Sequence, residues 1–170
     1  AGTTVLKAAK EAGVFVPTLC ASDKLSPYGS CRMCLVSIEG ARGLPASCTT
    51  PAADGMAVTT TTPEIDRLRR NVMELYLSDF GDVPQARSDG GRHPFLDIAA
   101  YVGVREVRYK GVRHDRPVDD SNPYFRFDPN LCIACGRCVR ACDEIQGTFA
   151  IQLLNRGFDT TVVAGAGVSF

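Results

Sequence analysis

The sequence lacks an excess of charge, because 19 Lys and Arg balance 19 Asp and Glu and the formal net charge is zero. The basic residues are spread along the chain, so we expect neither nucleic acid nor an anionic membrane as a partner. No apolar run approaches the ~20 residues that span a bilayer, and the start lacks the basic and apolar regions of a secretory signal. These absences predict a soluble, cytoplasmic protein without a membrane span. Its hydrophobic content of 45% and charged content of 22% are those of a chain that folds.

Cysteine is absent from residues 49–131, so that the eight cysteines of the chain form two tight groups. A disulfide framework requires no such interval, whereas grouped cysteines in a cytosolic protein more often bind metal. An initiator Met is missing before Ala1, and the chain stops at Phe170 within an apolar, glycine-rich stretch. We therefore expect the sequence to be a piece of a longer protein.

Local signals predict a mixture of short helices and strands. A threonine N-cap and Gly13 bound the first helix, and a second helix begins with Thr62 as N-cap and Pro63 in its first turn. We expect helices before Gly13 and over residues 62–78 and 95–102, and strands over residues 33–38, 44–50, 56–61 and 104–109. Irregular segments are expected over residues 80–94 and 113–123.

The first cysteine group has the spacing C-x10-C-x2-C-x13-C and comprises Cys20, Cys31, Cys34 and Cys48. Plant-type ferredoxins use the same order of one cysteine, a close pair and a distant one to hold a [2Fe–2S] cluster, although their first gap is shorter. Gly29 and Ser30 keep side chains small beside the pair, so that backbone N–H groups can approach cluster sulfurs. The alternative is a structural zinc site, but zinc usually draws its ligands as two short pairs. The pattern favours a [2Fe–2S] cluster.

The second cysteine group has the spacing C-x2-C-x2-C-x3-C and comprises Cys132, Cys135, Cys138 and Cys142. This is the bacterial ferredoxin motif, in which three thiolates hold one [4Fe–4S] cluster and the fourth cysteine ligates the other cluster. Asp143 follows Cys142 in place of the usual proline. We predict that Cys132, Cys135 and Cys138 hold a [4Fe–4S] cluster. Cys142 is then a ligand of a second [4Fe–4S] cluster, completed by a motif beyond Phe170, or the fourth ligand of the first.

The sequence between these motifs resembles one family closely. Together with the cysteines, the chain is similar to the N-terminal part of the catalytic subunit of cytosolic NAD-dependent formate dehydrogenases. Related segments occur in [FeFe] hydrogenases, the diaphorase part of NAD-reducing hydrogenases and the large iron–sulfur subunit of complex I. Complex I subunits tend to lack a cysteine at the position of Cys142. The segments that carry the resemblance are Leu68–Leu75, Val104–Tyr109, Ser121–Phe125 and Cys138–Ala150.

The resemblance implies an α+β fold in three parts. Residues 1–79 would form a β-grasp [2Fe–2S] ferredoxin-like domain that lacks its first hairpin and carries a trailing helix. Residues 80–123 would form a linker, and residues 124–170 a truncated bacterial-ferredoxin-like [4Fe–4S] domain. Family members usually carry a His and three Cys in the linker. Phe80 stands where this His is expected and no cysteine follows before Cys132, so we predict that this third cluster is absent and that His93 is an ordinary loop histidine.

The function implied by the resemblance is electron relay. A downstream molybdenum or tungsten bis-pterin guanine dinucleotide domain would oxidise formate, and a flavin- and NAD-binding diaphorase subunit would receive the electrons. We find no catalytic nucleophile–base pair, phosphate-binding glycine loop or pterin site in this sequence, so it predicts an oxidoreductase segment without a catalytic site of its own. The alternatives are the electron-transfer arm of an NAD-linked or [FeFe] hydrogenase, and a zinc-binding structural module.

Overall fold

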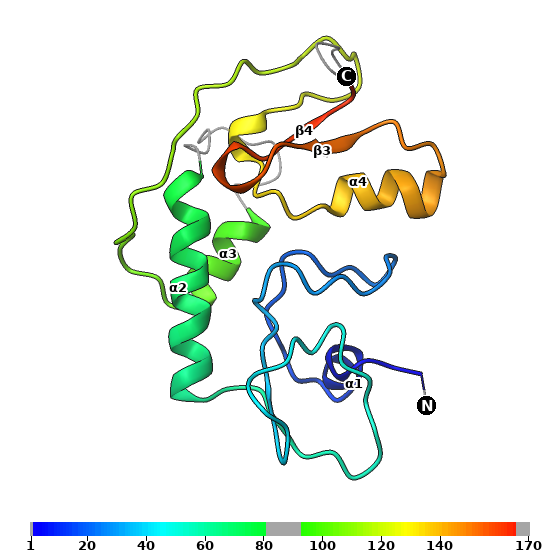
Figure 1. Cartoon of the computed structure of the whole chain (residues 1–170), viewed down its shortest axis with the longest axis vertical. Coiled ribbons are helices and arrows are strands. Elements are labelled where there is room, and N and C mark those ends of the chain that lie inside the picture. The colour runs from blue at the N-terminus through cyan, green and yellow to red at the C-terminus, as the bar shows by residue number, and fades with distance from the viewer. Residues whose placement is uncertain (1, 81–92, 166–170) are drawn as a thin grey trace. The chain divides into compact units, whose positions relative to one another are not determined.

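The computed structural model describes residues 2–80 and 93–165, and its contacts divide the chain into two compact units (Figure 1). Unit 1 comprises residues 1–74 and 93–105, and unit 2 comprises residues 75–92 and 106–170. The first cysteine group therefore lies in unit 1 and the second in unit 2.

Helix α1 (Val5–Glu11) opens unit 1 and has the predicted caps. The Thr4 hydroxyl accepts a hydrogen bond from the Lys7 N–H at 3.3 Å, and the helix ends at Ala12 before Gly13, whose φ is +75°. Val5 is buried, and Leu6 and Ala9 pack against the cysteine-bearing core. The predicted short helix is confirmed.

Helix α2 (Pro63–Asp79) also begins as predicted, since the Ile65 N–H donates to the Thr62 hydroxyl at 3.1 Å. Ile65 and Met73 on its buried face in unit 1 are fully buried, with Arg69 between them. Helix α3 (Pro94–Tyr101) confirms the helix predicted over residues 95–102. His93 directly precedes α3, and its ring lies edge-on to Phe95 at 6.3 Å between centroids.

The strands of unit 1 are shorter than predicted. Strand β1 (Ser37–Ile38) pairs antiparallel with β2 (Val58–Thr59), and the strand predicted over residues 44–50 does not form. Only Ala46 of residues 44–50 forms a bridge, with Leu35. The reason lies in the Ala46 carbonyl, which accepts the N–H groups of Thr49 and Thr50 and closes a turn. The backbone that would continue a strand is thereby bent around Cys48.

Unit 2 contains the turns and helices of the second cysteine group and one further hairpin. The 3₁₀ turn η1 (Pro129–Leu131) precedes α4 (Arg137–Ala141), which continues into the single π-helical turn η2 (Cys142–Gln146). Strand β3 (Gln152–Leu154) pairs antiparallel with β4 (Thr161–Val163) across the 3₁₀ turn η3 (Gly157–Asp159). The sequence did not predict this hairpin.

Two other predictions concern the segments around α3. Residues 104–109 form no strand, and Arg105 to Tyr109 are exposed, so the predicted strand is wrong. Most of the irregular segment predicted over residues 80–94 lies outside the described part of the chain, which omits residues 81–92. The polar loop predicted over residues 113–123 is present, with one bridge between Asp119 and Phe127.

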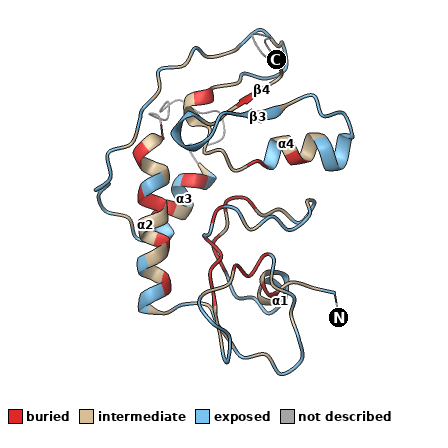
Figure 2. Ribbon diagram, in the orientation of Figure 1, coloured by how far each residue is buried: buried red, intermediate tan, exposed pale blue. Residues whose placement is uncertain are grey.

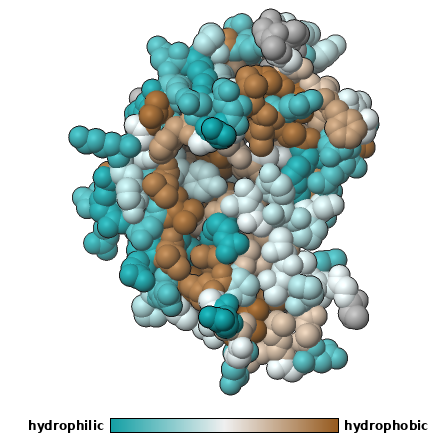
Figure 3. Space-filling model, in the orientation of Figure 1, coloured by the Kyte–Doolittle hydropathy of each residue, from teal (hydrophilic) through white to brown (hydrophobic). Residues whose placement is uncertain are grey.

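Burial is concentrated in the loops that carry the first cysteine group, as the red segments preceding α2 show (Figure 2). On the face shown in Figure 3, hydrophobic residues gather in patches that hydrophilic residues border. The most deeply buried part of unit 1 is the surroundings of its four thiols.

Within residues 2–80 and 93–165, no helix is long and apolar enough to cross a bilayer.

Candidate metal centres

All four cysteines of the first group are buried side by side in the core of unit 1. Cys20 has an exposed fraction of 0%, Cys31 of 3%, Cys34 of 1% and Cys48 of 4%. None of them forms a disulfide. Cys34 and Cys48 belong to one packed cluster with Val16 and Ala46. Four reduced thiols gathered in one buried core are candidate metal ligands, because the thiolate is the form of cysteine that binds metal.

The four thiols interact as two pairs. The Cys31 N–H donates to Cys20 Sγ at 3.4 Å, and a hydrogen bond between the two side chains, together with burial, raises the pKa of Cys31. A hydrogen bond with Cys48 lowers the pKa of Cys34 to about 6, and the same bond raises the pKa of Cys48. In the second pair the Cys48 thiol thus stabilises the thiolate of Cys34. Metal binding requires deprotonated thiols, so it would release protons from this group.

Cys48 is positioned by the turn that ended the predicted strand. The Thr50 carbonyl accepts the Val5 N–H at 2.9 Å, and the Ser47 carbonyl accepts the Leu6 N–H at 3.0 Å. These are first-turn N–H groups of α1, which have no partner inside their own helix. The carbonyls on either side of Cys48 therefore cap α1, and α1 in turn fixes the Cys48 backbone.

Cys34 is positioned through its carbonyl and those of its two neighbours. Ser47 donates to the Cys34 carbonyl twice, from its N–H at 2.9 Å and its hydroxyl at 2.8 Å. Arg69 donates to the carbonyls of Met33 at 3.0 Å and Leu35 at 2.8 Å. Residues 33–36 are all at most 5% exposed, so that water cannot replace these donors. Two side chains from distant positions therefore satisfy three consecutive buried carbonyls.

The loop from Cys20 to Cys31 requires a glycine at position 29. Gly29 has a φ of +70°, and a Cβ atom there would lie 3.0 Å from Thr49 Cγ2. The Gly29 backbone also lowers the pKa of Cys48, although the larger effects of Cys34 and of burial raise it. The small residue predicted beside Cys31 thus lets this loop approach the Cys48 turn.

This donor set suits a [2Fe–2S] cluster, in which each of two irons takes two cysteine thiolates. A single zinc ion would instead need its ligands gathered around one point. Among the residues that the structure describes, no three Cys, His, Asp or Glu side chains meet in that way. Two buried pairs of thiols are consistent with such a cluster.

The second cysteine group lies around the start of α4 and is less buried. Gly136, with a φ of +70°, is the N-cap of α4, and the Ala134 N–H donates to Cys132 Sγ at 3.4 Å. Burial raises the pKa of both Cys132 and Cys138. The charges of Cys138 and Cys135 add to the effect at Cys132, and those of Cys135 and Cys142 add to it at Cys138. The first three cysteines are thus near neighbours, as a cubane cluster requires.

Cys142 has a different environment at the end of α4. Its Sγ accepts the Ala150 N–H at 3.1 Å and lies 3.0 Å from the Thr148 hydroxyl oxygen. The hydrogen bond with Thr148 lowers the pKa of Cys142. The thiol is therefore held by the segment that follows η2, and its charge affects Cys138 less than the charge of Cys135 does.

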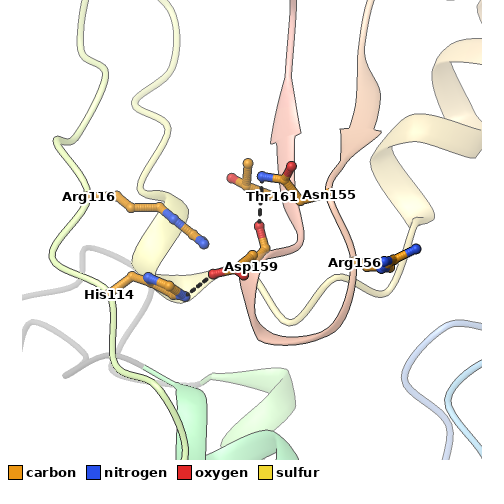
Figure 4. Close-up of a pocket in the computed structure, with 6 residues that line it drawn as sticks. All are labelled: His114, Arg116, Asn155, Arg156, Asp159 and Thr161. Atoms are coloured by element: carbon orange, nitrogen blue, oxygen red, sulfur yellow. Dashed lines mark hydrogen bonds and ion pairs between the residues drawn. The ribbon is translucent and has the colours of Figure 1, made fainter.

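A polar hollow of about 480 Å³ lies elsewhere in unit 2 (Figure 4). His114 Nε2 is 2.9 Å from the Phe158 carbonyl oxygen and 3.6 Å from Asp159 Oδ1, and the Asn155 side chain donates to the Asp159 carbonyl at 3.4 Å. No cysteine lines the hollow, so it adds no ligand to either centre. The lining residues are His114, Arg116, Asn155, Arg156, Asp159 and Thr161.

Sequence reasoning found the cysteines but missed Arg69 and Ser47. Arg69 stands at the spacing of four between Ile65 and Met73, which marks one helix face. A charged residue on that face is a signal for a buried partner, and it was visible in the sequence. Ser47, which is 0% exposed, had no comparable signal beyond its place before Cys48.

Comparisons with known proteins agree with these two centres. Residues 1–63 match a family described as "2Fe-2S iron-sulfur cluster binding domain", and residues 124–147 match one described as "4Fe-4S binding domain". The chain is thus an iron–sulfur protein with one domain of each kind.

Longer proteins share nearly the whole chain. It is 40% identical to a subunit of the NADH-quinone oxidoreductase of Rhizobium meliloti, over 98% of the chain and 20% of that protein. It is 40% identical to the alpha subunit of the NADPH-Fe(3+) oxidoreductase of Geobacter sulfurreducens, over 94% of the chain and 19% of that protein. The chain therefore spans about a fifth of the length of these curated relatives.

A solved structure gives the same relationship at the level of fold. A chain of the NAD+-reducing [NiFe]-hydrogenase in the H2-reduced state superposes with a TM-score of 0.82 at 31% identity, covering 94% of this chain and 67% of that one. The chain belongs to the family of iron–sulfur electron-transfer regions shared by NADH-quinone oxidoreductases, NADPH-Fe(3+) oxidoreductase and NAD+-reducing hydrogenase.

Proposed function

We propose that this chain is the electron-relay segment of a cytoplasmic, molybdenum- or tungsten-dependent formate dehydrogenase linked to NAD. The observation that carries the relay is the pair of cysteine groups in separate units, one with four buried thiols and one around the start of α4. The kinship with subunits of NAD(P)H oxidoreductases supports the link to a nicotinamide cofactor. The segments that resemble formate dehydrogenases favour formate as the electron source.

The proposed ligands follow the two groups. Cys20, Cys31, Cys34 and Cys48 would hold a [2Fe–2S] cluster in a β-grasp domain over residues 1–79. Cys132, Cys135 and Cys138 would hold a [4Fe–4S] cluster in a ferredoxin-like domain over residues 124–170, with residues 80–123 as the linker. Cys142 would serve a second [4Fe–4S] cluster or complete the first. Each cluster carries one electron at a time, and this chain's residues supply ligands, burial and orientation.

The proposed partners are a downstream pterin domain and a diaphorase subunit that binds flavin and NAD. Formate oxidation to carbon dioxide releases two electrons and a proton, and NAD+ accepts two electrons and a proton. Electrons that leave the pterin domain one at a time would therefore pass through this segment before they recombine at the flavin.

A second candidate function is the electron-transfer arm of an NAD-linked hydrogenase, and the superposition on such an enzyme favours it. The zinc-binding structural module is the candidate from another class. Iron and acid-labile sulfide analysis of the full-length protein, with low-temperature EPR after dithionite reduction, tests the relay. We expect a [2Fe–2S] signal together with faster-relaxing cubane signals, whereas colourless protein with stoichiometric zinc would refute the proposal.

The electron source is tested on the purified complex. We expect NAD reduction with formate and none with hydrogen. NAD reduction with hydrogen alone would replace the formate proposal by the hydrogenase one and leave the relay intact.

A further inference from the structure

Arg69 is a buried arginine on the cysteine-facing side of α2. Its exposed fraction is 2%, and Ile65 and Met73, one helical turn away on either side, are both 0% exposed. Arginine is rarely buried to this extent unless its donors are paired, because a guanidinium loses strong hydration in the core. A reason specific to this position is therefore expected.

The donors of Arg69 are used on both sides of Cys34. Nε donates to the Met33 carbonyl at 3.0 Å and Nη2 to the Leu35 carbonyl at 2.8 Å. One planar guanidinium presents several N–H groups in a fixed geometry, so that it can bind both carbonyls at once. The carbonyl of Cys34 itself points elsewhere, to Ser47. The two N–H groups of this guanidinium, which form a planar fork, fix the backbone on each side of Cys34.

The charge of Arg69 is only weakly neutralised. Asp66 Oδ1 is 3.9 Å from Nη1, and the Asp66 side chain is 38% exposed, so solvent screens this pair. The two carbonyls that accept from Arg69 are neutral. Burial lowers the pKa of Arg69, but an arginine remains charged at any pH at which the protein is folded. A positive charge thus lies within the core that contains Cys34, where the dielectric constant is low.

We propose that Arg69 is a positioning residue for Cys34 and that its charge raises the reduction potential of the [2Fe–2S] cluster on the first cysteine group. This inference rests on the proposed function, because it requires that cluster. Four thiolates make the oxidised cluster anionic, and reduction adds one more negative charge. A fixed cation in a low-dielectric core therefore stabilises the reduced form more than the oxidised form.

The test is a redox titration of the full-length protein, followed by the EPR signal of the [2Fe–2S] cluster. Arg69→Gln removes the charge, Arg69→Lys keeps it without the planar fork, and Arg67→Gln removes an exposed charge from the same helix as a control. For Arg69→Gln we expect the reduction equilibrium to shift at least tenfold toward the oxidised form, which is about 59 mV for a one-electron couple. Arg69→Lys should recover most of this shift, and Arg67→Gln should show none.

Several outcomes separate this inference from the proposed function. Wild-type protein without a [2Fe–2S] signal would refute the function itself. A wild-type signal with equal potentials in Arg69→Gln and Arg67→Gln would overturn the role of Arg69 alone. If Arg69→Gln binds no cluster, a loaded Arg69→Lys protein with a potential near the wild-type value supports the proposal. Loss of the cluster in both variants, with the cubane signals retained, would reduce Arg69 to a structural residue and overturn it.

Discussion

The two cysteine groups differ in how completely the protein surrounds them. Every thiol of the first group is at most 4% exposed, whereas Cys138 of the second group is exposed and its three companions are half-buried. The first group has donors on three consecutive carbonyls and a helix on the Cys48 turn. The second group has a glycine N-cap and a short helix. The same type of side chain is thus held in two ways.

The two centres therefore depend on different contacts within the chain. A [2Fe–2S] ligand set that is spread over two loops must be brought together by long-range contacts, and such contacts are present here. A C-x2-C-x2-C run places its three thiols by local spacing alone, so fewer supports are needed. We expect damage to the first centre to spread into its fold and damage to the second to remain local.

The strongest way to break this comparison is to remove one ligand from each group. Cys34→Ser should abolish the [2Fe–2S] signal and leave the cubane signals, and Cys135→Ser should do the reverse. Because Cys34 is 1% exposed and packs with Val16 and Ala46, we expect Cys34→Ser to lower the thermal midpoint more than Cys135→Ser does. EPR and a thermal melt of both full-length variants measure this. Equal losses of stability would contradict the distinction.

Much of the fold followed from local signals in the sequence. The caps of α1 and α2 and the position of α3 depend on neighbouring residues, and all three helices occur where they were predicted. The strands did not follow, because β propensity does not say where carbonyls find partners. The strand predicted from residue 33 begins only at Ser37, because Met33 and Cys34 lie in a turn, and the carbonyls of Met33 and Leu35 accept hydrogen bonds from Arg69.

The candidate sites divide in the same way. Cysteine spacing identified both groups, since residue type and spacing can be read directly from the sequence. The hydrogen bonds that hold the backbone at Cys34 could not be predicted in full. Their donors, Arg69 and Ser47, are 35 and 13 residues away from Cys34 in the sequence. Only folding brings such residues together.

Gly29 allows a sharper test of how closely the first group is packed. Gly29 and Gly43 have φ values of +70° and +72°, but only at Gly29 would a Cβ atom meet a neighbour, Thr49 Cγ2 at 3.0 Å. Both Gly→Ala variants should lose about 1–2 kcal/mol for the left-handed backbone. Gly29→Ala should lose about 1 kcal/mol more through overpacking beside Cys48. Urea unfolding of both variants measures the difference, and equal losses would show that Thr49 moves aside.

A smaller effect is expected from the hydroxyl group of Ser47. Ser47→Ala removes the 2.8 Å hydrogen bond to the Cys34 carbonyl but leaves the N–H bond to the same oxygen. Because Ser47 is 0% exposed, no water replaces the hydroxyl, and we expect a loss of about 1 kcal/mol of unfolding free energy. The exposed Ser30 provides the control, and Ser30→Ala should change the unfolding free energy by less than about 0.5 kcal/mol. Similar values for the two variants would mean that the hydroxyl contributes nothing to the Cys34 support.

The smallest effect concerns the surface of the first group, where Lys10 of α1 pairs with Asp23 of the cysteine loop. Lys10 lowers the pKa of Asp23, so the pair stabilises the fold above the unfolded-state value of about 4. This contribution is lost as the pH falls through the lowered pKa of the folded protein. Both side chains are largely exposed, at 66% and 75%, so the effect should be slight and should vanish at high salt. Urea midpoints of wild type and Asp23→Asn, compared from pH 6 downward, should converge as the pH falls. A gap that widens toward acid would mean that Asp23 acts through its protonated form and not through Lys10.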